Sequence, residues 1–202
     1  MCYLIGITGS SGGGKSDFGK MLNSKLPNSR YLDCDVWLPT AFSATGRDRL
    51  TTLFGAAIFH EDGTLNAGVF CSGEEEIKQS NAIIDSYIFP RTKEYIEASK
   101  ESAFVLVDFM RLPVCAEVWN ACEKKILVEA PEDDRLERLI VREPRYSKSQ
   151  FKRRDATGVA FDKCNADIVV TNNSTLEALE SKAEEIAELI KSELHIFKEV
   201  KS

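Results

Sequence analysis

The sequence lacks the features that mark secreted, membrane-spanning and metal-binding proteins. None of its six cysteines forms a C-x-x-C pair, and its two histidines stand alone among 202 residues. No apolar run approaches the length of a membrane span, and no basic and apolar leader precedes the first predicted strand. The net charge of −6 disfavours a surface for nucleic acid. We therefore expect one cytoplasmic domain over residues 1–202, with reduced thiols and with no membrane or nucleic-acid partner.

The sequence does contain a phosphate-binding loop, G-x-x-x-x-G-K-[ST], at residues 9–16. Apolar residues 3–7 predict a buried strand before it, and helical spacing of apolar residues predicts a helix after it. Glycines let backbone N–H groups approach a phosphate chain, and the helix directs its positive end at the same anion. We predict that Lys15 stabilises the transferred phosphate as a catalytic residue and that Ser16 helps to hold Mg²⁺. The predicted nucleotide-binding residues of the loop are Gly9, Ser11, Gly12, Gly13, Gly14, Lys15 and Ser16.

Aspartates follow two further predicted strands. Residues 30–35 predict a strand that ends in Asp33 and Asp35, and alternation along it would point both carboxylates to the same side. Such a carboxylate could accept a proton from an acceptor hydroxyl or hold a magnesium-bound water. The apolar run 103–107 ends in Asp108, which is typical of a magnesium-binding Walker B strand. Strand-end or helix-capping aspartates are the alternative for all three.

The rest of the chain predicts helices around a sheet. Residues of about 36–100 suggest a helical insertion made of short helices, which would bind an acceptor or merely cover the sheet. Arg138 and Arg142 share a helix face, and basic residues continue through a segment of about 144–163. This segment predicts a lid over ATP, with a solvated face paired to nearby glutamates as the alternative. Strands are expected at 125–130 and 167–171, followed by a long helix capped by residues 172–174.

Taken in order, these motifs resemble the dephospho-coenzyme A kinase family over nearly the whole chain. Gly6–Ser16 resembles the opening of the family's sequences, and Leu32–Asp35 resembles the family's Asp-x-Asp strand end. Asp62–Asn66 resembles part of its helical acceptor region. The spacing of Arg138, Arg142 and Arg153 resembles its lid, and Lys163–Asn172 resembles its last strand.

The resemblance implies a three-layer P-loop kinase fold with a five-stranded parallel sheet in the order 2-3-1-4-5. It implies transfer of the ATP γ-phosphate to the ribose 3′-hydroxyl of dephospho-coenzyme A, with Mg²⁺ as cofactor. Asp35 would be the general base, and Arg142 would act in catalysis. The remaining nucleotide-binding residues would be Asp33, Asp108, Arg138, Arg142, Arg153 and Asn172, with Ser16 and Asp108 at the metal.

Several positions depart from the family pattern, mostly where the acceptor would bind. Phe89 stands in place of a histidine, Ala67 in place of an arginine and Thr157 in place of a lid glutamine, and residues 109–113 differ from the usual Pro-Leu-Leu-Phe-Glu. The departures leave two alternatives to the main prediction. One is a P-loop kinase for another hydroxyl acceptor, such as a nucleoside. The other is a degenerate homologue that only binds nucleotide.

Overall fold

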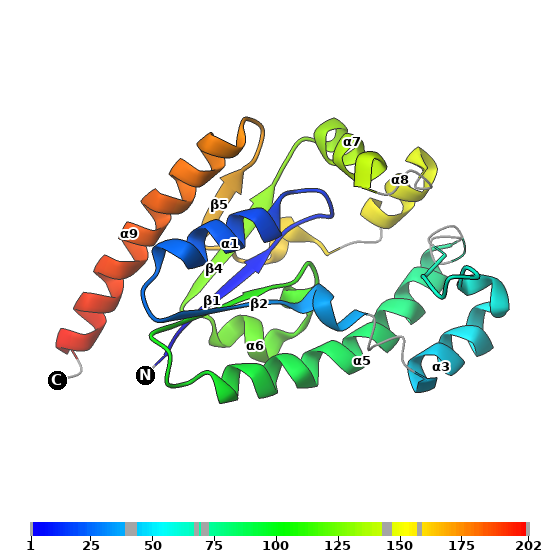
Figure 1. Cartoon of the computed structure of the whole chain (residues 1–202), viewed down its shortest axis with the longest axis horizontal. Helices are drawn as coiled ribbons and strands as arrows, with labels where there is room; N and C mark the ends of the chain where they lie inside the picture. Colours follow the sequence, from blue (N-terminus) through cyan, green and yellow to red (C-terminus); the bar gives the residue numbers. More distant parts are fainter. Residues whose placement is uncertain are drawn as a thin grey trace.

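A parallel sheet of five strands forms the centre of the protein (Figure 1). The computed structural model describes residues 2–38, 44–66, 69, 73–142, 147–156 and 159–200. All neighbouring strands are parallel and their order is β2-β3-β1-β4-β5, which confirms the expected topology. The strands are β1 (Tyr3–Thr8), β2 (Ser29–Asp33), β3 (Phe104–Asp108), β4 (Lys124–Glu129) and β5 (Ile168–Thr171).

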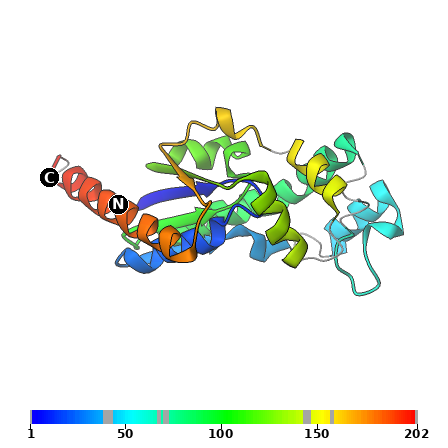
Figure 2. The same ribbon diagram turned by 90° about the horizontal axis from the view of Figure 1, so that it is seen from above.

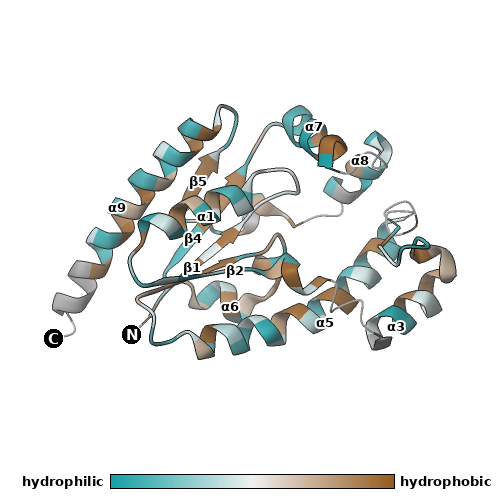
Figure 3. Ribbon diagram, in the orientation of Figure 1, coloured by the Kyte–Doolittle hydropathy of each residue, from teal (hydrophilic) through white to brown (hydrophobic). Residues whose placement is uncertain are grey.

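The central strands are apolar throughout because helices cover both of their faces. Along β1, Tyr3, Ile5 and Ile7 pack against α1 (Lys15–Lys25) and α9 (Leu176–Val200). Leu4 faces the other way, toward α5 (Glu74–Ala98) and α6 (Ala116–Ala121). Figure 2 shows these layers from above, and in Figure 3 α9 turns its hydrophilic residues away from the sheet. A strand buried on both faces needs apolar residues at every position, and this is why its sequence predicts it so clearly.

The predicted insertion of about 36–100 is largely helical, but it is not made of short helices alone. It contains α3 (Ala44–Phe54), a short 3-10 helix (Ala56–Ile58) and α5, which runs unbroken for 25 residues. The helical patch expected at 74–84 and its expected continuation at residues 88, 95 and 96 form one helix, α5. Buried residues recur along α5 up to Thr92, so packing on the sheet keeps the helix continuous through Pro90. Residues 39–43, 67–68 and 70–72, including Ala67, lie outside the described part.

Two further helices follow β4 in the region of the predicted lid. They are α7 (Glu132–Arg142) and α8 (Lys148–Ala156), and a 3-10 helix (Phe161–Lys163) comes next. Residues 143–146 and 157–158, including Thr157, lie outside the described part. In Figure 1, α7 and α8 stand on one side of the loop between β1 and α1, and α3 stands on the other with the start of α5. The loop between β1 and α1 thus lies between the region predicted as a lid and the region predicted as an insertion.

The expected cap of the last helix is one residue further along the chain. The Thr175 side-chain oxygen accepts a hydrogen bond from the N–H of Ala178 at 3.3 Å. Residues 172–174 therefore do not cap α9, and Asn172 has another partner, described below. Within the described residues, no helix combines the length and the apolar character that crossing a bilayer requires.

Candidate active site

The loop between β1 and α1 has the backbone of an anion-binding site. Gly14, at the start of α1, has φ +93°, and a Cβ there would lie 2.2 Å from Nδ2 of Asn172. Gly9 has φ +144°, and a Cβ there would lie 1.9 Å from the carbonyl oxygen of Val128. Only glycine fits these two positions without displacing its neighbours. Since α1 begins at Lys15, the unpaired N–H groups and the positive end of its dipole lie at the loop.

Two side chains hold the loop from behind. Nδ2 of Asn172 donates to the carbonyl of Gly13 at 3.0 Å. Nη1 of Arg138 donates to the carbonyl of Gly12 at 3.1 Å, and its Nη2 donates to the carbonyl of Asn172 at 3.3 Å. These bonds fix the backbone of the loop from its carbonyl side, and the N–H of Gly13 closes a turn onto the carbonyl of Ser10 at 3.1 Å. Sequence reasoning predicted both side chains as nucleotide contacts and missed this supporting role, because nothing in the spacing indicates contacts over such separations.

Asp108 is the most deeply buried carboxylate of the site. It is 1% exposed, and its Oδ2 accepts hydrogen bonds from Ser16 Oγ at 2.8 Å and from Tyr31 Oη at 2.9 Å. Burial raises the pKa of Asp108 to about 6, although nearby Lys15 acts in the opposite direction. Burial, together with the charge of Asp108, also raises the pKa of Tyr31. Tyr31 was missed at the sequence level because a tyrosine on a strand is an ordinary core residue.

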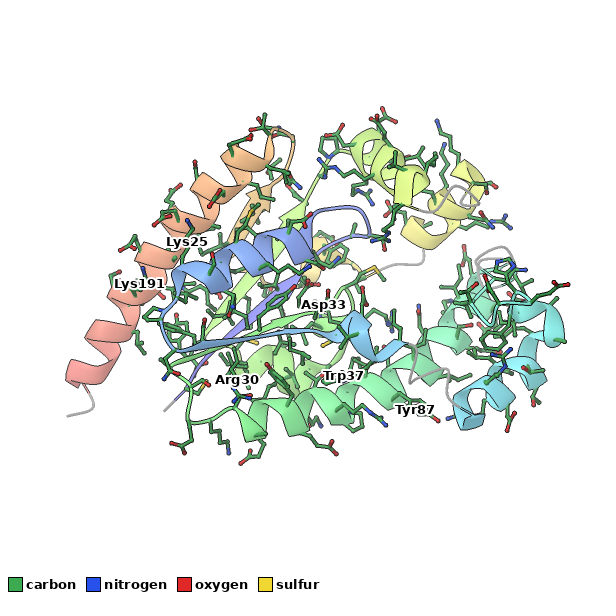
Figure 4. All side chains as sticks on the ribbon, in the orientation of Figure 1. Lys25, Arg30, Asp33, Trp37, Tyr87 and Lys191 are labelled. Carbon is green, nitrogen blue, oxygen red and sulfur yellow. The ribbon has the colours of Figure 1, made fainter. Side chains whose placement is uncertain are left out.

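Asp33 and Asp35 do not lie on one strand, and this corrects the prediction that alternation points them to the same side. β2 ends at Asp33, and the chain turns there into a 3-10 helix (Cys34–Trp37). Oδ1 of Asp33 accepts the N–H of Asp35 at 3.0 Å, so Asp33 caps this turn. Figure 4 labels Asp33 at the strand end and Trp37 just beyond it. The turn separates the two carboxylates and carries Asp35 to the cavity wall.

A cavity of about 580 Å³ brings most of the predicted residues together. Its wall includes Lys15 and Ser16 of the loop, Asp35, and Arg138 and Arg142 of α7. The Lys15 ammonium donates a hydrogen bond to the carbonyl oxygen of Ser10 at 3.4 Å. The cavity therefore joins the anion-binding loop to a carboxylate that could serve as a base.

Other predicted residues lie away from the cavity wall. Asp33, Asp108 and Asn172 are among them, and each bonds to a residue of the loop or to the turn after β2. Arg153 lies on α8, where its Nε donates to the carbonyl of Ser149 at 3.5 Å. Arg135, which belongs to the same basic run, forms a bidentate pair with Asp155 at 2.7 and 2.9 Å that ties α7 to α8.

The donor side could hold a magnesium ion together with phosphate oxygens. Ser16 Oγ and Asp108 Oδ2 are hard oxygen donors 2.8 Å apart beside the loop, and Mg²⁺ prefers few protein ligands plus substrate phosphates. Among the residues that the structure describes, no group of three or more His, Cys, Asp or Glu side chains could hold a metal ion alone. The donor set thus fits an ion that arrives with a nucleotide.

One wall of the cavity, which the family resemblance predicts to face an acceptor, is built from α5 and the segment after β3. The rings of Phe89 and Phe109 meet edge to face, with centroids 6.3 Å apart. The backbone carbonyl of Met110 accepts a hydrogen bond from Thr8 Oγ1 at 2.9 Å, which ties the segment to the end of β1. Arg111 pairs with Asp85 of α5. Phe109, which lines the cavity, therefore packs against Phe89, and both residues depart from the expected family pattern.

The comparisons with known proteins agree with this geometry. The family model for dephospho-CoA kinase matches residues 3–178. A dephospho-CoA kinase of Corynebacterium glutamicum is 28% identical, over 92% of this chain and 96% of that protein. An uncharacterized protein of Schizosaccharomyces pombe is 26% identical, over 93% of this chain and 83% of that protein. The crystal structure of TT1252 from Thermus thermophilus has a TM-score of 0.63 at 26% identity, covering 93% of this chain and 98% of that one.

Proposed function

Because the chain belongs to the dephospho-CoA kinase family, we propose that it transfers the γ-phosphate of ATP to the 3′-hydroxyl of dephospho-coenzyme A. The observation that carries the proposal is the shared cavity, whose wall contains both the anion-binding loop and the carboxylate of Asp35. A kinase of this kind must hold a triphosphate and an acceptor hydroxyl in line within one enclosed space. The cavity supports the proposal because residues from α1, α7 and the turn after β2 share its wall.

In the proposed mechanism, Asp35 orients the acceptor hydroxyl and receives its proton as the oxygen attacks the γ-phosphorus. Lys15 leaves the Ser10 carbonyl and follows the charge on the β- and γ-phosphates. Ser16 and Asp108 would hold Mg²⁺, which supplies neutralisation of the phosphate charge when it is bound. Arg142 adds positive charge from α7 across the cavity.

We also propose that α8 and the residues around it form a lid that brings Arg153 to the nucleotide. In the structure α8 is joined to α7 through the pair of Arg135 with Asp155. Several basic side chains of α8 are exposed, and phosphates are natural partners for such side chains.

The decisive experiment measures ATP turnover against a panel of acceptors and identifies the product by its mass. With dephospho-coenzyme A we expect a product that carries one additional phosphate, located on the 3′-hydroxyl. Asp35→Asn should lower turnover about 10²–10⁴-fold, the usual effect of losing a general base, with nucleotide affinity unchanged. Asp48→Asn, at an exposed aspartate on α3 outside the cavity wall, is the matched control.

The altered acceptor wall is the reason to include other hydroxyl compounds in the panel. Phe89 and Phe109 form a packed contact where the family pattern differs, so a kinase for another acceptor is the second candidate. Turnover with a nucleoside and none with dephospho-coenzyme A would replace the proposal by that candidate. Normal turnover of Asp35→Asn would exclude Asp35 as the base.

A further inference from the structure

Arg111, which lines the cavity, forms an ion pair with Asp85 of α5. Nε of Arg111 lies 2.9 Å from Oδ1 of Asp85, and Nη2 lies 2.6 Å from Oδ2. The two side chains are only 13% and 12% exposed. At this low exposure, each charge loses hydration, and the attraction between the two charges offsets that loss. The bidentate geometry fixes the guanidinium in one orientation.

The pair holds one edge of the guanidinium and leaves another edge available. Nε and Nη2 serve Asp85, whereas Nη1 has no hydrogen bond to any residue in the described part of the chain. Arg111 lines the cavity, while α5 contributes Asn81 and Ile84 to the wall rather than Asp85. Asp85, which does not line the cavity, thus anchors Arg111, which does, and Nη1 remains available as a donor.

The topology puts this donor on the acceptor side. Asp33 and Asp108 are register partners on neighbouring strands, which lie about 4.8 Å apart. Asp35 comes two residues after the end of β2, and Arg111 comes three residues after the end of β3, so one small molecule can touch both. Arg138 and Arg142 come instead from α7, which follows β4 on the other side of β1.

We propose that Arg111 is a specificity-determining residue that donates a hydrogen bond to a phosphate oxygen of the acceptor. The site would then select phosphorylated hydroxyl compounds over uncharged ones. Arginine suits this role because its planar fork can serve Asp85 on one edge and a phosphate on the other. This inference rests on the proposed function, since dephospho-coenzyme A carries a diphosphate near the hydroxyl that reacts.

The test separates acceptor binding from catalysis by steady-state kinetics. Arg111→Met removes the donors while keeping the length of the side chain. We expect it to raise the KM for dephospho-coenzyme A about 10- to 100-fold, as for a lost charged hydrogen bond, and to leave the KM for ATP unchanged. With adenosine as an uncharged acceptor, kcat/KM should be the same for variant and wild type. Arg91→Met, at a half-buried arginine of α5 outside the cavity wall, is the matched control.

A charge swap distinguishes binding from a purely structural ion pair. The double variant Asp85→Arg with Arg111→Asp rebuilds the pair in reverse and puts a carboxylate at the wall. The inference expects the Tm to recover relative to Arg111→Met but the KM for the acceptor to stay high. Recovery of both, or an equal loss of turnover with dephospho-coenzyme A and adenosine in Arg111→Met, would overturn it.

The panel of acceptors also separates this inference from the proposed function. If the wild-type protein uses a different phosphorylated acceptor, the dephospho-coenzyme A proposal fails and the role of Arg111 stands, with its KM test repeated on that acceptor. If an uncharged acceptor is preferred, the role of Arg111 is refuted. Absence of turnover with every acceptor refutes both.

Discussion

Replacing the buried Asp108 by asparagine should shift the stability of the ligand-free protein, relative to the wild type, in favour of the variant as the pH rises. The carboxylate is 1% exposed, and burial raises its pKa from 3.8 to about 6. The folded state therefore binds this proton more tightly than the unfolded state does. The contribution of the Asp108 carboxyl group to the free energy of unfolding is fully present below pH 3.8 and is lost as the pH rises through about 6.

The size of the effect follows from the two pKa values. The difference between about 6 and 3.8, at about 1.36 kcal/mol per pKa unit, is on the order of 3 kcal/mol. For a chain of this length, this free energy corresponds to roughly 6–12 °C in Tm. In Asp108→Asn, one oxygen can still accept from both Ser16 and Tyr31, because both bonds go to Oδ2. The buried amide donors add a cost of about 1–3 kcal/mol that does not depend on pH.

The measurement is the difference in Tm between Asp108→Asn and the wild type from pH 4 to pH 7.5. EDTA should be present and nucleotide absent, because a divalent ion beside Asp108 would stabilise its charge. Other titrating groups are common to both proteins and cancel in the difference. We expect the difference to shift in favour of the variant through pH 6 and then to level off. A difference that is constant with pH, or that moves in favour of the wild type, would refute the reasoning.

Two further predictions concern the donor side. Lys15→Ala should abolish phosphoryl transfer without lowering the Tm. As the control, Lys20→Ala, at an exposed lysine of the same helix, should leave turnover unchanged. Turnover of Lys15→Ala close to that of the wild type would show that Lys15 is not catalytic. Amide hydrogen exchange in residues 148–156 should slow when an ATP analogue binds, if α8 closes as a lid. Equal exchange with and without the analogue would count against closure.

The strands of the sheet were predictable because burial on both faces leaves a pattern within each strand's own sequence. Strands buried on both faces must be apolar along their whole length, and such runs marked β1, β3 and β4 to within one or two residues. The P-loop was equally clear because its chemistry needs glycines at particular positions, as Gly14 illustrates. The strand order came from the family resemblance, and the structure confirms it.

The side-chain contacts of the site were not predictable from periodicity. The bond from Tyr31 to Asp108 spans 77 residues, and the bond from Asn172 to Gly13 spans 159. No local pattern encodes such a distance. The turn at Asp35 was missed for a different reason, since its residues continue the alternation of β2 while the Asp33 side chain caps a new helix and ends the strand.

The segment after β3 links the two halves of the site more tightly than its departure from the family pattern suggested. Asp108 ends the strand beside Ser16 on the donor side. Two residues later, Met110 bonds to Thr8 through its carbonyl and to Ser11 through its sulfur. Arg111 then reaches Asp85 on the acceptor side. Because Asp108, Met110 and Arg111 lie within four consecutive positions, the backbone cannot shift at one half without moving the other. A substitution at Arg111 should therefore be compared with one at Asp85, which removes the anchor and keeps the arginine, before any change in activity is assigned to the acceptor alone.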